Sequence, residues 1–272
     1  MNRRLLPNTV ALVVALLTAF PLYWMVLSAF KPAGEIQSLE VRPWTSHPTL
    51  DNFVHVLTGE NFARYLLNSA IVALVVVVLS AGIAFLAAVA VTRFAFRFRT
   101  TVLIMFLIAQ MVPVEALTIP LFFVVRDLGL LNTLASLIVV QLAFTMPFAV
   151  WMLRGFVAGV PEALEEAAMI DGAGRATVLW RILFPLVAPG LVATSVFSFI
   201  TAWNDFVFAR TFIISAKDNQ TLPAALLVFF KPDGNDWGGI MAASTLMTIP
   251  VLIFFVAVQR RLVSGLGGAV KD

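Results

Sequence analysis

The chain has 272 residues, of which 61% are hydrophobic and only 12% are charged, and its mean hydropathy is +0.97. A soluble protein carries about 25% charged residues, so this composition has too few charges to cover soluble domains. It indicates a polytopic helical membrane protein. The chain has no cysteine, which excludes disulfides and thiolate sites.

Six stretches are long and apolar enough to cross a bilayer, which takes roughly 20 mostly apolar residues. Their apolar runs are continuous rather than alternating, which favours helices over strands. We therefore predict an all-α fold, one transmembrane domain over residues 1–272 with about six membrane-spanning helices. The predicted spans are residues 10–30, 69–91, 101–123, 134–153, 186–208 and 241–258.

The orientation of the spans follows from lysine and arginine in the short loops. The sharpest signal is the loop after the second span, where Arg93, Arg97 and Arg99 occur without an acidic residue, and Arg3 and Arg4 precede the first span. We predict that this loop and both termini lie in the cytoplasm. The predicted external loops are residues 31–68, 126–132 and 209–239.

The most informative segment is the polar stretch between the fourth and fifth spans, residues 156–185, which we call the interspan loop. Pro161 suits the start of a helix, because the missing N–H of proline is not needed there. Glu162, Glu165 and Glu166 then fall in the first two turns, near the positive end of the helix dipole. The predicted orientation places this loop in the cytoplasm.

Gly172 is a typical helix terminator, and a second short helix is predicted over residues 175–184, ended by Pro185. The small side chains of Ala167 and Ala168 would allow the backbone of a partner to approach closely. An alternative is an amphipathic helix that lies on the membrane surface. The acidic first half argues against it, because such helices favour lysine and arginine.

The spacing in the interspan loop resembles the EAA loop of the membrane subunits of binding-protein-dependent ABC importers. The sequence Glu166-Ala167-Ala168 is followed by three residues, Gly172, nine residues, Ile182 and then Pro185. The family pattern has leucine before the proline, where this chain has Phe184, an apolar replacement. The resemblance extends over essentially the whole chain and is narrower for the carbohydrate branch, in particular the shorter, six-span permease of the maltose-importer type. The other segments that carry it are Phe30-Lys31, residues 49–53, Trp203-Asn204-Asp205 and residues 259–271.

The resemblance implies that the interspan loop forms a coupling helix seated in a cleft of an ATP-binding subunit, which the C-terminal tail also touches. The residues implied in docking are Glu166, Ala167, Ala168, Gly172, Ile182 and Pro185. It further implies two ATP-binding subunits, a homologous second permease, usually a different chain, and an extracytoplasmic binding protein, in a bacterial or archaeal plasma membrane. The chain has no phosphate-binding G-x-x-x-x-G-K-[ST] sequence. ATP hydrolysis is therefore expected on a separate subunit, and we expect no enzyme activity, cofactor or nucleic-acid partner for this chain.

Polar residues within spans are costly and often functional. Those predicted to lie there are Glu115, Gln141, Trp203, Asn204 and Asp205. One interpretation places them along a hydrophilic path for a sugar, where aromatic faces and hydrogen-bonding side chains combine. The other is hydrogen bonding between helices and, for Glu115, a position close to the outer interface. Both stay open.

Pro113 and Pro120 are predicted to kink or break the third span, either as a packing irregularity or as a gate. His47 and His55 both fall in the first external loop without a third ligand, so no metal site is predicted. No set of catalytic side chains converges in the sequence.

The leading hypothesis is the membrane subunit of an ATP-driven importer for a sugar, oligosaccharide, polyol or glycerol phosphate. The alternative is a stand-alone secondary transporter or channel that works as an oligomer. Such proteins usually show coupling-ion carboxylates at mid-membrane or inverted repeats, and neither is clear in this sequence.

Overall fold

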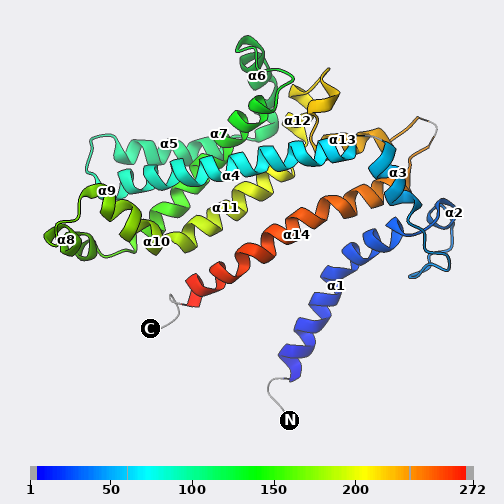
Figure 1. The fold of residues 1–272 in the computed structure, drawn as a ribbon, viewed down its shortest axis with the longest axis horizontal. Helices are drawn as coiled ribbons and strands as arrows, with labels where there is room; N and C mark the ends of the chain where they lie inside the picture. The colour runs from blue at the N-terminus through cyan, green and yellow to red at the C-terminus, as the bar shows by residue number, and fades with distance from the viewer. Residues whose placement is uncertain (1–4, 60, 233, 268–272) are drawn as a thin grey trace. The chain divides into compact units, whose positions relative to one another are not determined.

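The computed structural model describes residues 5–59, 61–232 and 234–267, and within these ranges the chain is helical with no strand (Figure 1). Its contacts divide it into two compact units, which are described separately. Unit 1 comprises Met1–Leu66 and Ala225–Leu252, and unit 2 comprises Leu67–Ala224 and Ile253–Asp272. Arg3, Arg4 and the last part of the predicted ATPase-contacting tail, residues 268–271, lie outside the described residues.

Among the described residues, four helices are long and apolar enough to cross a membrane, or up to six if two bent helix pairs each count as one span. This confirms the predicted all-α polytopic fold. The four helices are α1 (Leu5–Ala29), α4 (Phe62–Arg93), α7 (Leu134–Ala158) and α14 (Trp237–Gly267). The bent pairs are α5 (Arg99–Met111) with α6 (Val114–Asp127), and Arg175–Leu186 with α11 (Ala188–Trp203).

The third predicted span, residues 101–123, is not one continuous helix. It breaks between α5 and α6, whose axes differ by 103°. Proline pushes the residue before it into an extended conformation, and Val112 before Pro113 has φ −78° and ψ 125°. Pro120, by contrast, lies inside α6 without ending it. Of the two prolines that were predicted to kink or break this span, Pro113 is the one that breaks it.

The fifth predicted span, residues 186–208, is shorter than expected. Helix α11 ends at Trp203, and α12 (Val207–Phe212) is a separate helix. The Asp205 carboxylate accepts backbone N–H bonds from Phe208 (3.2 Å) and Ala209 (3.1 Å). An aspartate that caps a new helix in this way competes with continuation of the old one, so Asn204 and Asp205 lie between helices.

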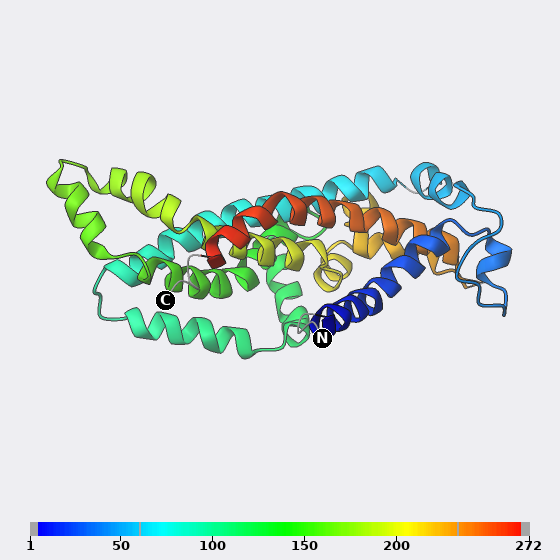
Figure 2. The same cartoon turned by 90° about the horizontal axis from the view of Figure 1, so that it is seen from below.

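The core of unit 2 forms where α4, α7 and α11 run side by side (Figures 1 and 2). Ser80 of α4 and Ser198 of α11, both buried, are joined by a hydroxyl–hydroxyl hydrogen bond of 2.9 Å. Gly190 lets α11 approach α7 closely, since a Cβ atom there would lie 2.5 Å from the Phe156 ring. In a membrane the surrounding lipid is itself apolar, so burying apolar surface does not drive helices together. Close packing at small residues and hydrogen bonds between hydroxyl groups hold them together instead.

The segment that follows α12 is held to the rest of unit 2 by side chains bonded to its backbone. Asn132, in the left-handed conformation with φ +64°, accepts N–H bonds through Oδ1 from Ile214 (2.7 Å) and Ser215 (2.9 Å). Its own N–H donates to the Phe212 carbonyl at 2.8 Å. Further along, Ser69 Oγ accepts the Leu222 N–H at 2.8 Å. The first part of this predicted external loop, up to Ala224, is therefore held within unit 2.

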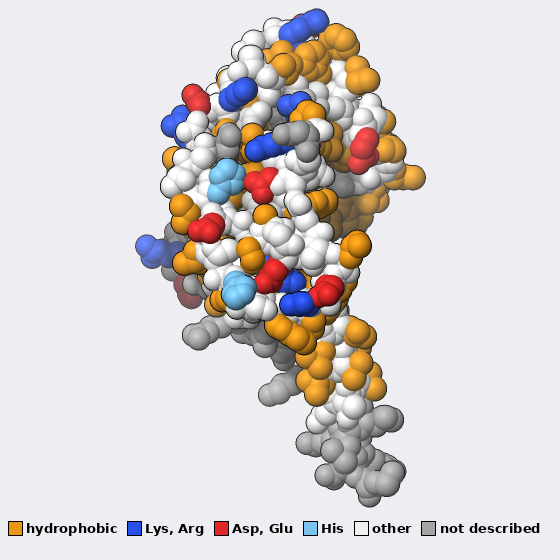
Figure 3. Space-filling view, turned by 90° about the vertical axis from the view of Figure 1, so that its right-hand side faces the viewer, with side chains coloured by type: hydrophobic (Ala, Val, Ile, Leu, Met, Phe, Trp, Pro, Cys, Tyr) orange, Lys and Arg blue, Asp and Glu red, His pale blue; other side chains and the backbone are white. Residues whose placement is uncertain are grey.

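Unit 1 is built from α1, α2 (Ala33–Ile36), α3 (Asp51–Gly59), η3 (Leu226–Phe229) and the start of α14. Asn52 of α3 donates through Nδ2 to the carbonyls of Ala29 (2.9 Å) and Lys31 (2.8 Å), which fixes the end of α1. His55 lies 3.2 Å from the Asp236 carboxylate. Figure 3 shows both histidines on a face that mixes acidic and basic side chains. The apolar stretch of α1 has none of its residues buried within the chain.

Replacing Asn132 tests how the loop after α12 is held. Asn132→Ala removes the shared acceptor, and we expect amide hydrogen exchange at Ile214 and Ser215 to speed up about fivefold, because each hydrogen bond contributes about 1 kcal/mol. Asn132→Asp keeps the acceptor and should exchange like the wild type. Asn132→Gly can adopt the same left-handed backbone conformation but has no side-chain acceptor. Exchange as slow as in the wild type for this variant would show that the Asn132 side chain does not hold the loop.

Candidate functional site

The interspan loop forms two short helical segments joined by a turn (Figure 1). After α7, Pro161 is the N-cap of α8 (Glu162–Ile170), and Glu162 and Glu165 fall in the first turn of α8, at the positive end of its dipole. Beyond the turn come α9 (Arg175–Thr177), a π-helix η1 (Val178–Leu183) and α10 (Phe184–Leu186), which leads to α11.

Gly172 makes the turn that ends α8. It has φ +88°, a conformation that side chains with a Cβ atom disfavour. Its N–H donates to the Met169 carbonyl at 3.1 Å, and the Ala173 N–H donates to the Ala168 carbonyl at 2.9 Å. This pair of bonds is the Schellman arrangement, which satisfies the last free carbonyls of a helix. The turn direction is therefore set by the backbone itself.

The second helical segment differs from its prediction, because it does not end at Pro185. It passes through this proline to Leu186. The preceding turn is a π-helix, and the Phe184 N–H donates to the Leu179 carbonyl, five residues back. The hydrogen-bond ladder has thus shifted before it reaches the missing N–H of Pro185, and it returns to ordinary spacing with the Val187 N–H on the Leu183 carbonyl (3.0 Å).

Helix α8 buries none of its nine residues. Three of its apolar side chains are exposed: Leu164, Met169 and, at 86% exposure, Ile170. The residues implied in docking are placed as follows: Glu166, Ala167, Gly172 and Pro185 are exposed, and Ala168 and Ile182 are half-buried.

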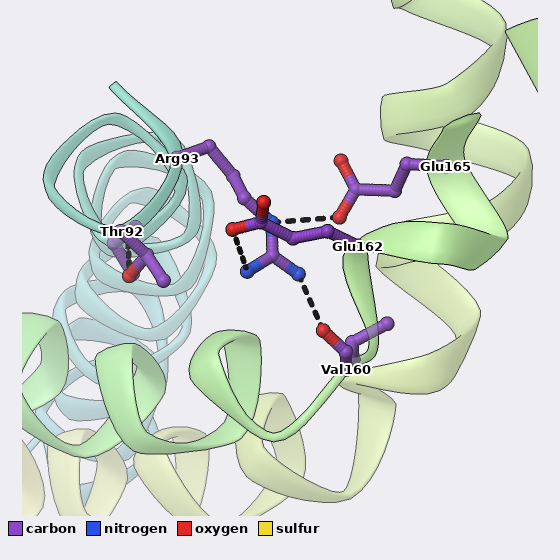
Figure 4. A network of polar contacts seen from close by, with 6 residues as sticks. Thr92, Arg93, Val160, Glu162 and Glu165 are labelled. Carbon is purple, nitrogen blue, oxygen red and sulfur yellow. Dashed lines mark hydrogen bonds and ion pairs between the residues drawn. The ribbon is translucent and has the colours of Figure 1, made fainter. Parts of the chain in front are cut away.

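Arg93, the last residue of α4, joins α4 to both ends of the α7–α8 connection (Figure 4). Its Nε donates to Glu165 Oε1 at 2.7 Å, and its Nη2 donates to the Val160 carbonyl at 2.8 Å. Its Nη1 lies 3.6 Å from Glu162 Oε1. The Arg93 and Glu165 side chains are only 10% and 13% exposed. A charge-assisted hydrogen bond is shorter and stronger than one between neutral groups.

The sequence pointed to Arg93 only as a sign of orientation, and to Glu165 only as a partner of the helix dipole. Their pairing spans 72 positions of the chain. The available signal was an arginine at the last residue of one span and a cluster of carboxylates in the loop on the same side of the membrane. That signal does not say which carboxylate the arginine meets.

A cavity of about 370 Å³ lies beside this network, between the end of α4, α8 and η1. Its walls are mostly apolar and include Val89, Phe94, Met169 and Leu179, with Arg93 and Glu165 at its edge. Helix α8 is therefore not closely packed on the end of α4 by apolar contacts.

The residues predicted to lie along a path are only partly brought together. Gln141 and Trp203 are buried, at 3% and 1% exposure, and the Gln141 side chain lies close to the Asp205 carboxylate. The Trp203 ring stacks on Phe199 with centroids 5.4 Å apart, and its buried Nε1 has no hydrogen-bond partner among the described residues. Asn204 is exposed beside them.

Glu115 is exposed in the first turn of α6. Within the part of the chain that the structure describes, no three of the side chains that bind metals through His, Cys, Asp or Glu come together.

The fold is that of a polytopic helical membrane protein, with the exposed helix α8 between two of its spans. Residues 80–267 match the family model of the binding-protein-dependent transport system inner membrane component. The chain belongs to this family, which confirms the resemblance drawn from the interspan loop.

Relatives of known designation match over almost their full length. The chain is 42% identical to the diacetylchitobiose uptake system permease protein DasC of Streptomyces coelicolor, over 98% of this chain and 97% of that protein. It is 36% identical to the trehalose/maltose transport system permease protein MalG of Thermococcus litoralis, over 99% and 97%. Among solved structures, a chain of a bacterial ABC transporter involved in the import of the acidic polysaccharide alginate has the same fold, with TM-score 0.80, 19% identity, and 96% and 98% coverage.

Gly172→Ala tests the turn. We expect a cost of about 1–2 kcal/mol, because alanine is strained in the left-handed conformation, and faster hydrogen exchange at the Ala173 amide. Gly174→Ala is the matched control, since Gly174 has φ −73° and open space where a Cβ would stand. Equal responses of the two variants would contradict a conformational role for Gly172.

Proposed function

We propose that this chain is the permease subunit of an ATP-driven importer that moves a carbohydrate delivered by an extracytoplasmic binding protein. The main observation behind the proposal is helix α8, which exposes three apolar side chains and has no buried residue. A helix with this surface, ending in a turn fixed by Gly172, is suited to the groove of a partner.

The partner of α8 is proposed to be an ATP-binding subunit. The exposed Glu166 would face a basic group of that subunit, and Ala167 and Ala168 would let its backbone come close. Ile182 and Pro185 shape the segment that returns to α11. Closure of two such subunits on ATP would push α8 and rock the spans toward an outward-open state.

The substrate class is inferred from relatives whose names state their cargo, among them diacetylchitobiose, trehalose or maltose, and arabinooligosaccharides. Membership of the same family and the high coverage support a carbohydrate here. We propose that Gln141, Trp203, Asn204 and Asp205 contribute to the path, where the unpaired Trp203 Nε1 offers a hydrogen-bond donor. Glu115, exposed in the first turn of α6, is proposed as a further member.

The remaining partners follow from surfaces that this chain leaves uncovered. The unburied apolar stretch of α1 requires lipid or a homologous second permease, and we propose both. The binding protein would dock on the external loops, and both termini would lie in the cytoplasm. A stand-alone carrier or channel, the alternative, gives α8 no partner and would purify without an ATP-binding subunit.

Ile170→Asp tests docking. We expect the amount of co-purified ATP-binding subunit to fall at least about tenfold while membrane insertion persists, because burying a carboxylate in an apolar groove costs more than about 1.4 kcal/mol. Val54→Asp, at another exposed apolar position on the external helix α3, should leave co-purification unchanged. Undiminished recovery of the ATP-binding subunit with Ile170→Asp would exclude α8 as the dock.

The absence of cysteine makes orientation directly measurable with single-cysteine variants. In intact cells, a membrane-impermeant maleimide should label Val54→Cys but not Ile170→Cys, and both should react after the membrane is permeabilised. Labelling of Ile170→Cys from outside would reverse the proposed orientation and place α8 where no ATP-binding subunit can reach it.

A further inference from the structure

Helix α8 has two kinds of attachment to the spans of unit 2. One is covalent, at both ends of α8: directly from α7 through residues 160–161, and through the turn at Gly172 and the η1–α10 segment into α11. The other has to be non-covalent, and apolar packing supplies little of it, since α8 buries no residue and a cavity of about 370 Å³ lies between it and the end of α4. A force on α8 would therefore reach α7 and α11 along the chain and would reach the end of α4 directly only through specific contacts. A second, indirect route to α4 is the packing of Phe85 against Trp180 and Phe184, with ring centroids 5.8 and 5.5 Å apart.

The Arg93 network supplies those contacts. The guanidinium is planar and holds its donors in a fixed fork, and here separate nitrogens reach Glu165 on α8 and the Val160 carbonyl before it. The third nitrogen, Nη1, lies 3.6 Å from Glu162 Oε1. Because the side chains of Arg93 and Glu165 are largely buried, solvent screens this pair less than an exposed ion pair. The end of α4 and the start of α8 are thus tied in both distance and direction.

We propose that Arg93 is a positioning residue that transmits the movement of α8 to α4. This inference rests on the proposed docking of α8 with an ATP-binding subunit. When α8 is pushed, α11 moves through the chain and α4 moves through the Arg93–Glu165 pair. The two spans are joined again by the Ser80–Ser198 bond, so they move as one body. Without the pair, α8 can swing into the adjacent cavity, so less of its movement is passed to the end of α4 and to the body that α4 forms with α11.

The test uses the complete importer, reconstituted in liposomes with its binding protein, and measures sugar uptake per ATP hydrolysed. Arg93→Met should keep the ATP-binding subunit bound and ATP hydrolysis active, yet lower this ratio about tenfold, within the range of typical coupling between sites. Arg93→Lys keeps the positive charge but not the forked set of donors, so its uptake per ATP should lie between those of the wild type and Arg93→Met. Arg97→Met is the matched control, because Arg97 is an exposed arginine of the same loop, and its ratio should not change.

A double-mutant cycle tests whether the two side chains act as one. The ratio for Arg93→Met with Glu165→Gln should be no lower than for the worse single variant, since residues that share one interaction are not additive. Losses that multiply would overturn the proposal. So would a wild-type ratio for Arg93→Met, or loss of the ATP-binding subunit from that variant, because the latter would make Arg93 part of the dock itself.

A covalent replacement separates transmission from folding. In the cysteine-free chain, Arg93→Cys with Glu165→Cys can be joined by a short bifunctional thiol reagent with a reducible link. We expect uptake per ATP to recover on crosslinking and to fall again on reduction. An uptake per ATP that is the same with and without the crosslink would contradict the proposal. If the wild-type importer shows no ATP-driven uptake, the proposed function itself fails; if only the Arg93 variants behave like wild type, this inference alone fails.

Discussion

A backbone that crosses lipid has no water to bond to, so its N–H and C=O groups have to be paired within the chain. This constraint accounts for the helical fold of the described residues and for where irregular backbone occurs. Irregular backbone occurs at Val112–Pro113, in the π-helix before Pro185 and at Asn204–Asp205, and the last two of these are accompanied by substitute hydrogen bonds. The carboxylate of Asp205 caps α12, and the π-turn shifts the ladder ahead of the proline.

The interspan loop combines two properties that usually oppose each other, exposure and order. A helix of nine residues is too short to be stable by itself, and α8 gains nothing from burial. Its order comes instead from its two ends. The Schellman bonds at Gly172 fix the C-terminal end, and Arg93 fixes the N-terminal end through Glu165 and Val160. The apolar side chains between these ends stay free for a partner.

Membership of the inner membrane component family gives this arrangement its setting. A membrane subunit that belongs to a binding-protein-dependent system has to respond to events on both faces of the bilayer. Unit 2 contains structure suited to each. The segment after α12 is held by Asn132 and Ser69, and the interspan loop is held by Arg93. The buried Trp203 and Gln141 lie in the spans that connect them.

Much of the fold and part of the candidate site could be predicted from the sequence by itself. Apolar runs long enough to span lipid, the break at Pro113 and the turn at Gly172 depend on composition and on local backbone sterics, so they can be read without neighbours. Tertiary structure decided the rest. Whether Pro185 ends a helix depends on the ladder around it, and whether Asp205 continues a span depends on the helix it caps. The partner of Arg93 lies 72 residues away, and only packing brings it within reach, because no local pattern specifies which of several carboxylates will be nearest.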